Sequence, residues 1–280
     1  MLNPVIGGRL AWARACRDAR WVARAQPRRR IFGFGVGTSK TGSHSLAAMF
    51  AGRYRAVHEA EPLGVARLMR GRARGRLTEA EIGRRIQRRV ARMNLELDVA
   101  PFHGPFVEHY AELFPGARCV HLHRDVYSWF DAQVNQHVGR YAPFAYREIR
   151  RHLYGAQRAT DPREGALVEY GMGPLRSYLL AWADQNRRML ASLPDGRTLR
   201  VRTFELSRKV EELADFFAVP VETLNAERAH AFSARVKLGV IERIDADYFN
   251  AAVREICGDV MDALYPEMKD SRDAGFHAGR

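Results

Sequence analysis

Cysteine and long apolar runs are scarce in this chain. The three cysteines are scattered without C-x-x-C spacing, which excludes a disulfide framework and a cysteine metal site; they are Cys16, Cys119 and Cys257. We interpret them as reduced, buried thiols of a cytoplasmic protein. No run of 18 apolar residues predicts a membrane span, and residues 1–8 are too short and too weakly apolar for a signal-peptide core.

Internal repeats and long Pro/Gly/Ser linkers are also absent from the sequence. The 280 residues are enough for one α/β domain of moderate size with helical insertions, and we assign that domain to residues 30–268. A basic helix or arm is predicted before it at residues 1–29, and a tail after it at residues 269–280.

Lysine is rare although the chain is strongly basic. The formal net charge is +13, yet only four of the 45 cationic side chains are lysines: Lys40, Lys209, Lys237 and Lys269. A charge of this size attracts polyanions. A compact ammonium group, where arginine is otherwise used, suggests a specific need at Lys40, which lies in a motif described below.

Arginine is concentrated in two blocks. The first, Arg9 to Arg30, predicts a helix or tail laid against the domain, with contact to a membrane surface or a partner as the alternative. The second, Arg67 to Arg92, predicts an amphipathic helix with a solvated arginine face, with a lid or groove for an acidic acceptor as the alternative. No helix-turn-helix signature, zinc spacing or RNP motif is present, so specific nucleic-acid binding is not expected.

Residues 31–46 are the most informative segment, because they predict a buried strand, a tight polar loop and the start of a helix. Loops of this build bind phosphate-like anions through backbone N–H groups and the helix dipole. A nucleotide P-loop would need G-x-x-x-x-G-K-[ST], but Ser43 and His44 occupy its last two positions. A dinucleotide fingerprint fails as well, because Lys40 stands where its third glycine belongs. A magnesium-dependent kinase is therefore disfavoured.

A second motif follows about eighty residues later. Residues 117–123 predict another short strand, which leads into Arg124-Asp125 and then into a helix that contains Trp129. Taken alone, Asp125 is explained by a carboxylate at the start of a helix with a local ion pair. Its position after the first loop favours a shared site for the two motifs.

The two motifs together resemble those of sulfotransferases that use 3′-phosphoadenosine-5′-phosphosulfate (PAPS). Lys40 to Leu46, K-T-G-S-H-S-L, resembles their 5′-phosphosulfate loop, and Arg124-Asp125 resembles the R-D pair whose arginine binds the 3′-phosphate. The resemblance implies an α/β fold with a central parallel sheet flanked by helices, in the P-loop-like sulfotransferase architecture. It also implies PAPS as co-substrate, its product 3′-phosphoadenosine-5′-phosphate (PAP), and no metal. The implied donor-binding residues are Lys40, Thr41, Gly42, Ser43, His44, Ser45, Arg124 and Ser128.

The chain departs from the family pattern at two positions. Val126 replaces the usual proline after R-D, and Ala132 replaces a serine that shares the 3′-phosphate. Ser128, one helical turn earlier, is the predicted substitute. Further segments follow the family order over residues 30–265; they include a helix near Tyr178 to Asn186, a strand near Arg200, a helix at residues 210–217 and a closing helix near residues 256–265.

The general base that would take the acceptor proton has several candidates. Residues 55–61 predict a second strand and its end, and open α/β sheets bind ligands at the carboxyl ends of strands. We rank Glu59 first, then His58, Asp98 and His103, and count Lys40 with them as a catalytic group that stabilises the leaving phosphate. His121 and His123 share one strand face, but without a third ligand no metal site is predicted.

The sequence therefore predicts an enzyme that moves a sulfuryl group from PAPS to a hydroxyl or amine acceptor by in-line displacement. The acceptor class, whether small molecule, saccharide or lipid, is left open. One alternative is a phosphotransferase with a degenerate P-loop, which would bind ATP with Mg²⁺. The other is a non-enzymatic protein that binds anionic polymers or membranes through its arginine blocks.

Overall fold

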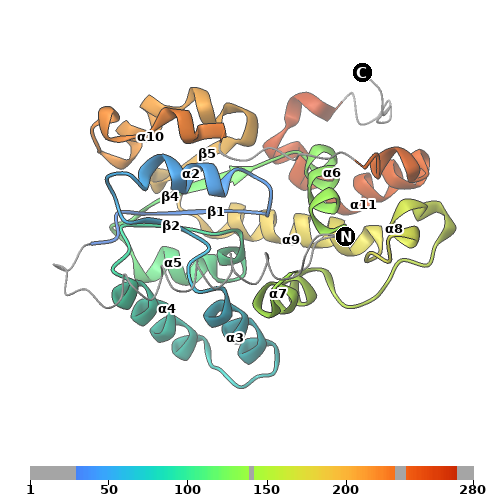
Figure 1. The fold of residues 1–280 in the computed structure, drawn as a ribbon, viewed down its shortest axis with the longest axis horizontal. Helices are drawn as coiled ribbons and strands as arrows, with labels where there is room; N and C mark the ends of the chain where they lie inside the picture. The colour runs from blue at the N-terminus through green and yellow to red at the C-terminus, as the bar shows by residue number, and fades with distance from the viewer. Residues whose placement is uncertain (1–29, 139–141, 231–237, 270–280) are drawn as a thin grey trace, which may run out of the picture.

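The computed structural model describes residues 30–138, 142–230 and 238–269, so the predicted N-terminal arm and the tail from residue 270 onward lie outside the described residues. A five-stranded parallel sheet crosses the centre, with helices on both faces (Figure 1). The strands, in the order of the sheet, are β2 (Ala56–His58), β3 (Leu97–Val99), β1 (Gly33–Gly37), β4 (Arg118–His123) and β5 (Thr198–Arg202). The predicted α/β class and parallel sheet are confirmed.

Most of the predicted elements are present, with sharper boundaries. The second strand, the helix after Arg124-Asp125, the helix of residues 210–217 and the closing helix all form, and the closing helix begins ten residues earlier than the segment that suggested it. The α-helices of the described residues are α2 (Ser43–Phe50), α3 (Pro62–Ala73), α4 (Glu79–Met93), α5 (Val107–Leu113), α6 (Val126–His137), α7 (Phe144–Tyr154), α8 (Ala166–Glu169), α9 (Leu175–Ser192), α10 (Val210–Phe217) and α11 (Ala246–Leu264).

The two faces of β1 explain how the helices are layered. Phe34 and Val36 point into a core with residues of α3, α4 and α5. The opposite face carries glycine, and a Cβ on Gly35 would lie 2.8 Å from Leu46 of α2. Because this face has no side chains, α2 can lie directly on the central strand. Figure 1 accordingly shows α2 and α10 on one face of the sheet, and α3, α4 and α5 on the other.

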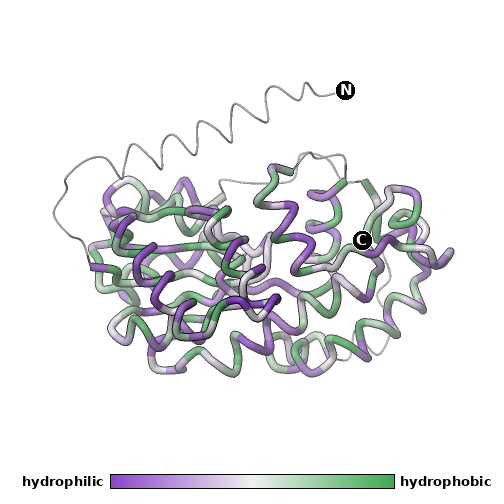
Figure 2. The backbone as a smooth tube through the Cα atoms, turned by 90° about the horizontal axis from the view of Figure 1, so that it is seen from below, coloured by the Kyte–Doolittle hydropathy of each residue, from purple (hydrophilic) through white to green (hydrophobic). Residues whose placement is uncertain are grey.

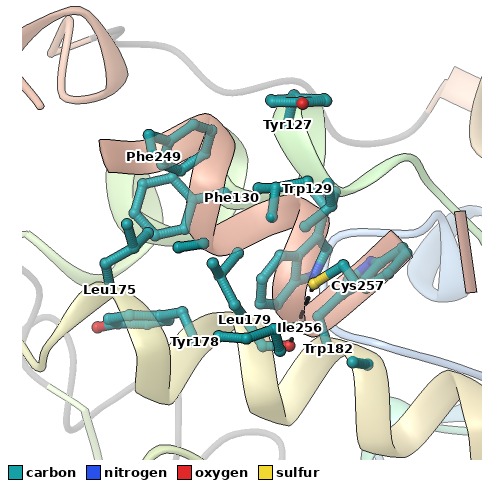
Figure 3. Packing of buried hydrophobic residues seen from close by; sticks show 14 of the residues in the cluster. Tyr127, Trp129, Phe130, Leu175, Tyr178, Leu179, Trp182, Phe249, Ile256 and Cys257 are labelled. Atoms are coloured by element: carbon teal, nitrogen blue, oxygen red, sulfur yellow. Dashed lines mark hydrogen bonds between the residues drawn. The ribbon is translucent and has the colours of Figure 1, made fainter. Parts of the chain in front are cut away.

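A second core lies beside the sheet and joins α6, α9 and α11. Trp129 and Phe130 of α6 pack against Trp182 of α9 and Phe249 of α11, and all four are fully or almost fully buried (Figure 3). Cys257 also belongs to this core, and its thiol donates to the carbonyl of Leu179 at 3.7 Å. This cluster fixes α6, the helix that carries the second motif, against the rest of the domain.

The arginine block at residues 67–92 contains two helices, α3 and α4, rather than one. Helix α4 is amphipathic as predicted, with Ile82, Ile86, Val90 and Met93 buried, and it begins at a capping box formed by Thr78 and Glu81. One arginine of this helix does not lie on the predicted solvated face: Arg89 is 5% exposed and pairs with a buried aspartate described below.

The buried state of two predicted thiols is confirmed. Cys119 and Cys257 are free and buried, and burial raises the pKa of both thiols. Hydrophilic and hydrophobic residues alternate along the helices (Figure 2). None of the helices in the described ranges combines the length and hydropathy that a membrane span needs.

Candidate functional site

The loop between β1 and α2 lies at the carboxyl edge of the sheet. Gly37 ends β1 so close to β4 that a Cβ would lie 2.2 Å from the carbonyl oxygen of Leu122. Gly42 is the N-cap of α2 with φ 96°, and the hydroxyl of Thr41 donates to the carbonyl of Thr38 at 2.7 Å. In the described part of the chain no side chain caps α2, so the N–H groups of its first turn can bind an anion.

Lys40 occupies a conformation that is uncommon for a residue with a Cβ. Its φ is 70°, in the left-handed region, and the residue is half-buried. Such backbone outliers persist where the surrounding structure over-determines them, and they gather at functional sites. The surrounding loop is held from α6, because the indole N–H of Trp129 donates to the carbonyl of Ser39 at 2.8 Å. One hydrogen bond between residues 90 positions apart thus joins the two motifs.

The second motif lies at the end of the neighbouring strand. Gly37 and Leu122 are partners in the β1–β4 register, so Arg124 follows β4 where the loop follows β1. The Nε of Arg124 donates to the hydroxyl of Ser128 at 2.9 Å. Burial lowers the pKa of Arg124, although neighbouring carboxylates oppose that shift, and the guanidinium stays charged at neutral pH.

Asp125 has the local role that a carboxylate at a helix start predicts. It is the N-cap of α6 and accepts from the backbone N–H of Ser128 at 2.9 Å and from the hydroxyl of the same serine. Ala132, where a serine was expected, is buried. Ser128 therefore lies beside Arg124, as a substitute for that serine must, and its contact with an anion stays a prediction.

The predicted base candidates of β2 meet the first turn of α2. The Nε2 of His58 lies 3.0 Å from the hydroxyl of Ser43 and 3.8 Å from a carboxylate oxygen of Glu59. The ring of His44 approaches His58 edge-on, with centroids 5.1 Å apart. The hydroxyl of Tyr146 in α7 donates to the other oxygen of Glu59 at 2.9 Å. The structure thus brings Ser43, His44, His58 and Glu59 together.

Asp98 lies apart from this group, on the face of the sheet that α4 and α5 cover. Its side chain is fully buried, pairs with Arg89 and accepts from Tyr110 at 3.2 Å. Burial, the largest single effect, would raise the pKa of this carboxyl, but the charges of Arg89 and His103 and the hydrogen bonds from Arg89 and Tyr110 together lower the pKa. This position favours a structural role for Asp98 over the predicted catalytic one.

His103 belongs to the same buried cluster. Its ring stacks on Tyr110 with centroids 4.5 Å apart, its Nε2 lies 3.6 Å from Asp98, and burial lowers its pKa to about 4. It stands in a 3-10 helix, Pro101–Phe106. The burial of this imidazole, which is 1% exposed, favours a structural role for His103 over the predicted one as a base candidate.

His121 and His123 share one face of β4 as predicted, with ring centroids 5.5 Å apart. His121 bonds Asn186 at 3.2 Å, and His123 bonds the hydroxyl of Tyr265 at 2.9 Å. Burial lowers their pKa values to about 4 and about 3. Across the described ranges no group of three His, Cys, Asp or Glu residues has the arrangement of a metal site.

Sequence reasoning missed two residues that the structure connects to the candidates. Tyr146 lies in a segment without a motif and 87 residues from Glu59, so no local pattern indicated their bond. Arg89 is one of ten arginines between residues 67 and 92. Only its place on the apolar side of the helical period, between Ile86 and Val90, distinguished it from its exposed neighbours.

Neither a protein-family model nor a curated protein sequence matches this chain. Solved structures do match it. A sulfotransferase from Mycobacterium avium aligns with a TM-score of 0.53 and 13% identity, over 90% of this chain and 81% of that one. A sulfotransferase from Alicyclobacillus acidocaldarius aligns with a TM-score of 0.44 and 14% identity, over 84% of this chain and 96% of that one. A sulfotransferase domain from the curacin biosynthetic pathway aligns with a TM-score of 0.35 and 16% identity, over 69% of this chain and 75% of that one. The likeness to the Mycobacterium avium structure shows that the fold is sulfotransferase-like.

Proposed function

We propose that this chain is a PAPS-dependent sulfotransferase that moves a sulfuryl group to an acceptor hydroxyl or amine. One observation carries the proposal: an uncapped helix N-terminus with Lys40 in its loop lies beside Arg124, at the ends of two neighbouring strands. Two cationic groups that follow neighbouring strands at one sheet edge suit a donor that carries phosphate at both its 5′ and 3′ positions. The sulfotransferase-like fold supports the same activity.

The residues present fit a donor of this kind. Gly37 lets the end of β1 lie close to β4, Gly42 supplies the left-handed turn before α2, and the first turn of α2 offers N–H groups from Ser43 onward. Arg124, whose Nε donates to the hydroxyl of Ser128, has further guanidinium N–H groups for a second phosphate, and Ser128 can join it as a donor only if its hydroxyl turns away from Asp125. A sulfuryl group carries less charge than a phosphoryl group, so lysine, hydroxyl and backbone donors suffice to stabilise the departing phosphate without a metal.

Glu59 is the residue we assign to the acceptor proton. The acceptor oxygen forms the new bond to sulfur, its proton passes to the Glu59 carboxylate, and the old sulfur–oxygen bond breaks with its electron pair left on the 5′-phosphate. His58 lies 3.8 Å from Glu59 and 3.0 Å from Ser43, so it links the base to the first turn of the donor helix. Lys40 stabilises the negative charge that develops on the leaving phosphate.

Turnover tests the proposal directly. Labelled PAPS is incubated with the protein and a panel of hydroxyl acceptors comprising a phenol, a monosaccharide and a long-chain alcohol, and PAP release is measured. Lys40→Ala should lower turnover by at least a hundredfold, because one oxyanion donor is worth about 10² to 10³ in rate. Lys209→Ala is the matched control, since Lys209 pairs with Glu212 on the surface. Equal rates for the two variants would contradict the assigned role of Lys40.

A further inference from the structure

Tyr146 lies outside the predicted set, and its side chain contacts the assigned base. It stands in the first turn of α7, and its hydroxyl donates to Oε2 of Glu59 at 2.9 Å. The other carboxylate oxygen, Oε1, lies 3.8 Å from Nε2 of His58. Two different elements, α7 and the end of β2, therefore hold the two oxygens of one carboxylate.

The backbone of Glu59 is fixed in an uncommon conformation, so the contact with Tyr146 acts on the orientation of the side chain. Its φ is 54°, in the left-handed region that residues with a Cβ rarely adopt. The backbone N–H of Glu59 donates to the carbonyl of Val99 at 2.9 Å, so the turn after β2 is anchored to β3. An anchored backbone leaves the side-chain torsions as the remaining freedom, and a single hydrogen bond to the carboxylate is enough to select among them.

Helix α7 is held in place by contacts that do not involve the Tyr146 hydroxyl. Ile149 is buried in the core beneath the sheet, and Glu148 accepts a hydrogen bond from Arg70 of α3. The guanidinium of Arg70 also lies 5.8 Å from the ring centroid of Phe144. Removing the hydroxyl of Tyr146 should therefore leave α7 where it is, which makes the contact testable by a single oxygen atom.

We propose that Tyr146 is a positioning residue that orients the Glu59 carboxylate for the acceptor proton. The proposal rests on the proposed function, in which Glu59 accepts that proton. Tyr146 donates to one oxygen and so directs the remaining lone pairs of the carboxylate away from α7. A phenol that donates to a carboxylate also stabilises its ionised form, which is the form a base needs. Sulfuryl transfer depends on alignment, so a small loss of orientation is costly.

The test is Tyr146→Phe, measured as PAP release from labelled PAPS with water alone and with the acceptor panel. We expect kcat to fall at least tenfold while the acceptor KM and the Kd for PAP stay unchanged, because only the orientation of Glu59 is lost. Tyr248→Phe is the matched control: its hydroxyl donates to Glu164 at 3.0 Å, another tyrosine–glutamate bond, on α11 and outside the candidate site. It should keep full kcat.

A double variant separates positioning from a general loss of structure. Glu59→Gln removes the base, and Tyr146→Phe should then cause no further fall in kcat, because the two residues act as one unit. If the unmodified protein is active, either of two results would overturn the positioning role alone. One is an unchanged kcat in Tyr146→Phe, and the other is a double variant in which the two losses of kcat multiply. Failure of the unmodified protein to release PAP under any condition would overturn the proposed function and this inference together.

Discussion

The buried ion pair between Arg89 and Asp98 offers the sharpest test of the fold beneath the site. Arg89 and Asp98 are 5% and 0% exposed, and Arg89 also donates to the carbonyl of Ala60 at 2.8 Å. Asp98→Asn removes one charge and leaves the guanidinium buried without a countercharge. Breaking a buried pair in this way costs about 3 to 5 kcal/mol. We therefore expect the free energy of unfolding to fall by about this amount.

Another arginine of α4, which forms a surface ion pair, provides the control. Arg92, three residues after Arg89, pairs with Glu61, but its side chain is 50% exposed. Water and salt screen such a pair, so Arg92→Ala should cost about 0 to 1 kcal/mol. A third variant replaces both buried partners, Arg89→Met with Asp98→Leu. It should recover most of the lost stability, because no unpaired charge remains in the core.

Urea unfolding at pH 7, followed by circular dichroism, measures all three variants. Equal slopes against denaturant are needed before the midpoints are compared. The lowered pKa of Asp98 means that its contribution is fully present above the unfolded pKa of about 3.9 and is lost as the pH falls through the lower folded pKa. The reasoning fails if Asp98→Asn is as stable as the unmodified protein, or if the double variant is no more stable than Asp98→Asn.

Three further outcomes are expected. Gly37→Ala places a Cβ 2.2 Å from the carbonyl of Leu122, so it should cost about 1 to 3 kcal/mol in thermal or urea unfolding and abolish PAP binding, whereas Gly52→Ala, with nothing within 4 Å, should do neither. Ser128→Ala removes the partner of Arg124 and should weaken the Kd for PAP by about tenfold in titration calorimetry, while Ser192→Ala at the end of α9 should leave it unchanged. Burial lowers the folded pKa of His103 to about 4, below the unfolded value of about 6.5. Between these pH values the unfolded chain binds more protons than the folded one, so the free energy of unfolding decreases as the pH falls. His103→Phe should make this decrease shallower, and a pH profile of the unfolding midpoint identical to that of the unmodified protein would refute the prediction.

The loop after β1 was predictable because its pattern is local. A buried strand, a polar loop and the start of a helix were predicted within residues 31–46, and the structure has β1 ending at Gly37 and α2 beginning after its N-cap Gly42. The carboxyl end of β2 was predictable for a similar reason. Parallel strands end at one edge of the sheet, so His58 and Glu59 had to lie near the loop if β2 joined the same sheet.

The face of the sheet on which Asp98 lies could not be predicted from the sequence. A strand places alternate side chains on opposite faces, and the sequence around Asp98 does not say which face α2 covers. The register sets Asp98 beside Phe34, which points toward α4 and α5, and so turns it away from the loop. The role of Arg89 could not be predicted either. Its partner Asp98 lies on β3, so the pair is recognised only when the position of β3 beside α4 is known.

Tyr146 marks a second limit of prediction from sequence. Contacts across 87 residues depend on how an irregular excursion folds back on the domain, and that depends on packing such as the pairing of Arg70 with Glu148. The same holds for Trp129, whose bond to Ser39 joins the loop after β1 to α6. The sequence predicted that the motif at residues 40–46 and the motif at Arg124-Asp125 share one site, and the structure adds the contact that joins them.

Titration calorimetry with PAP, 5′-AMP and ATP·Mg²⁺ tests the central claim most directly. The unmodified protein should bind PAP more tightly than 5′-AMP, because only PAP carries the 3′-phosphate assigned to Arg124. Arg124→Ala should reduce PAP binding to the level of 5′-AMP, and Lys40→Ala should weaken both ligands. If the folded protein binds no PAP, binds PAP and 5′-AMP equally, or prefers ATP·Mg²⁺, the assignment of this site to a PAPS-dependent sulfotransferase is contradicted.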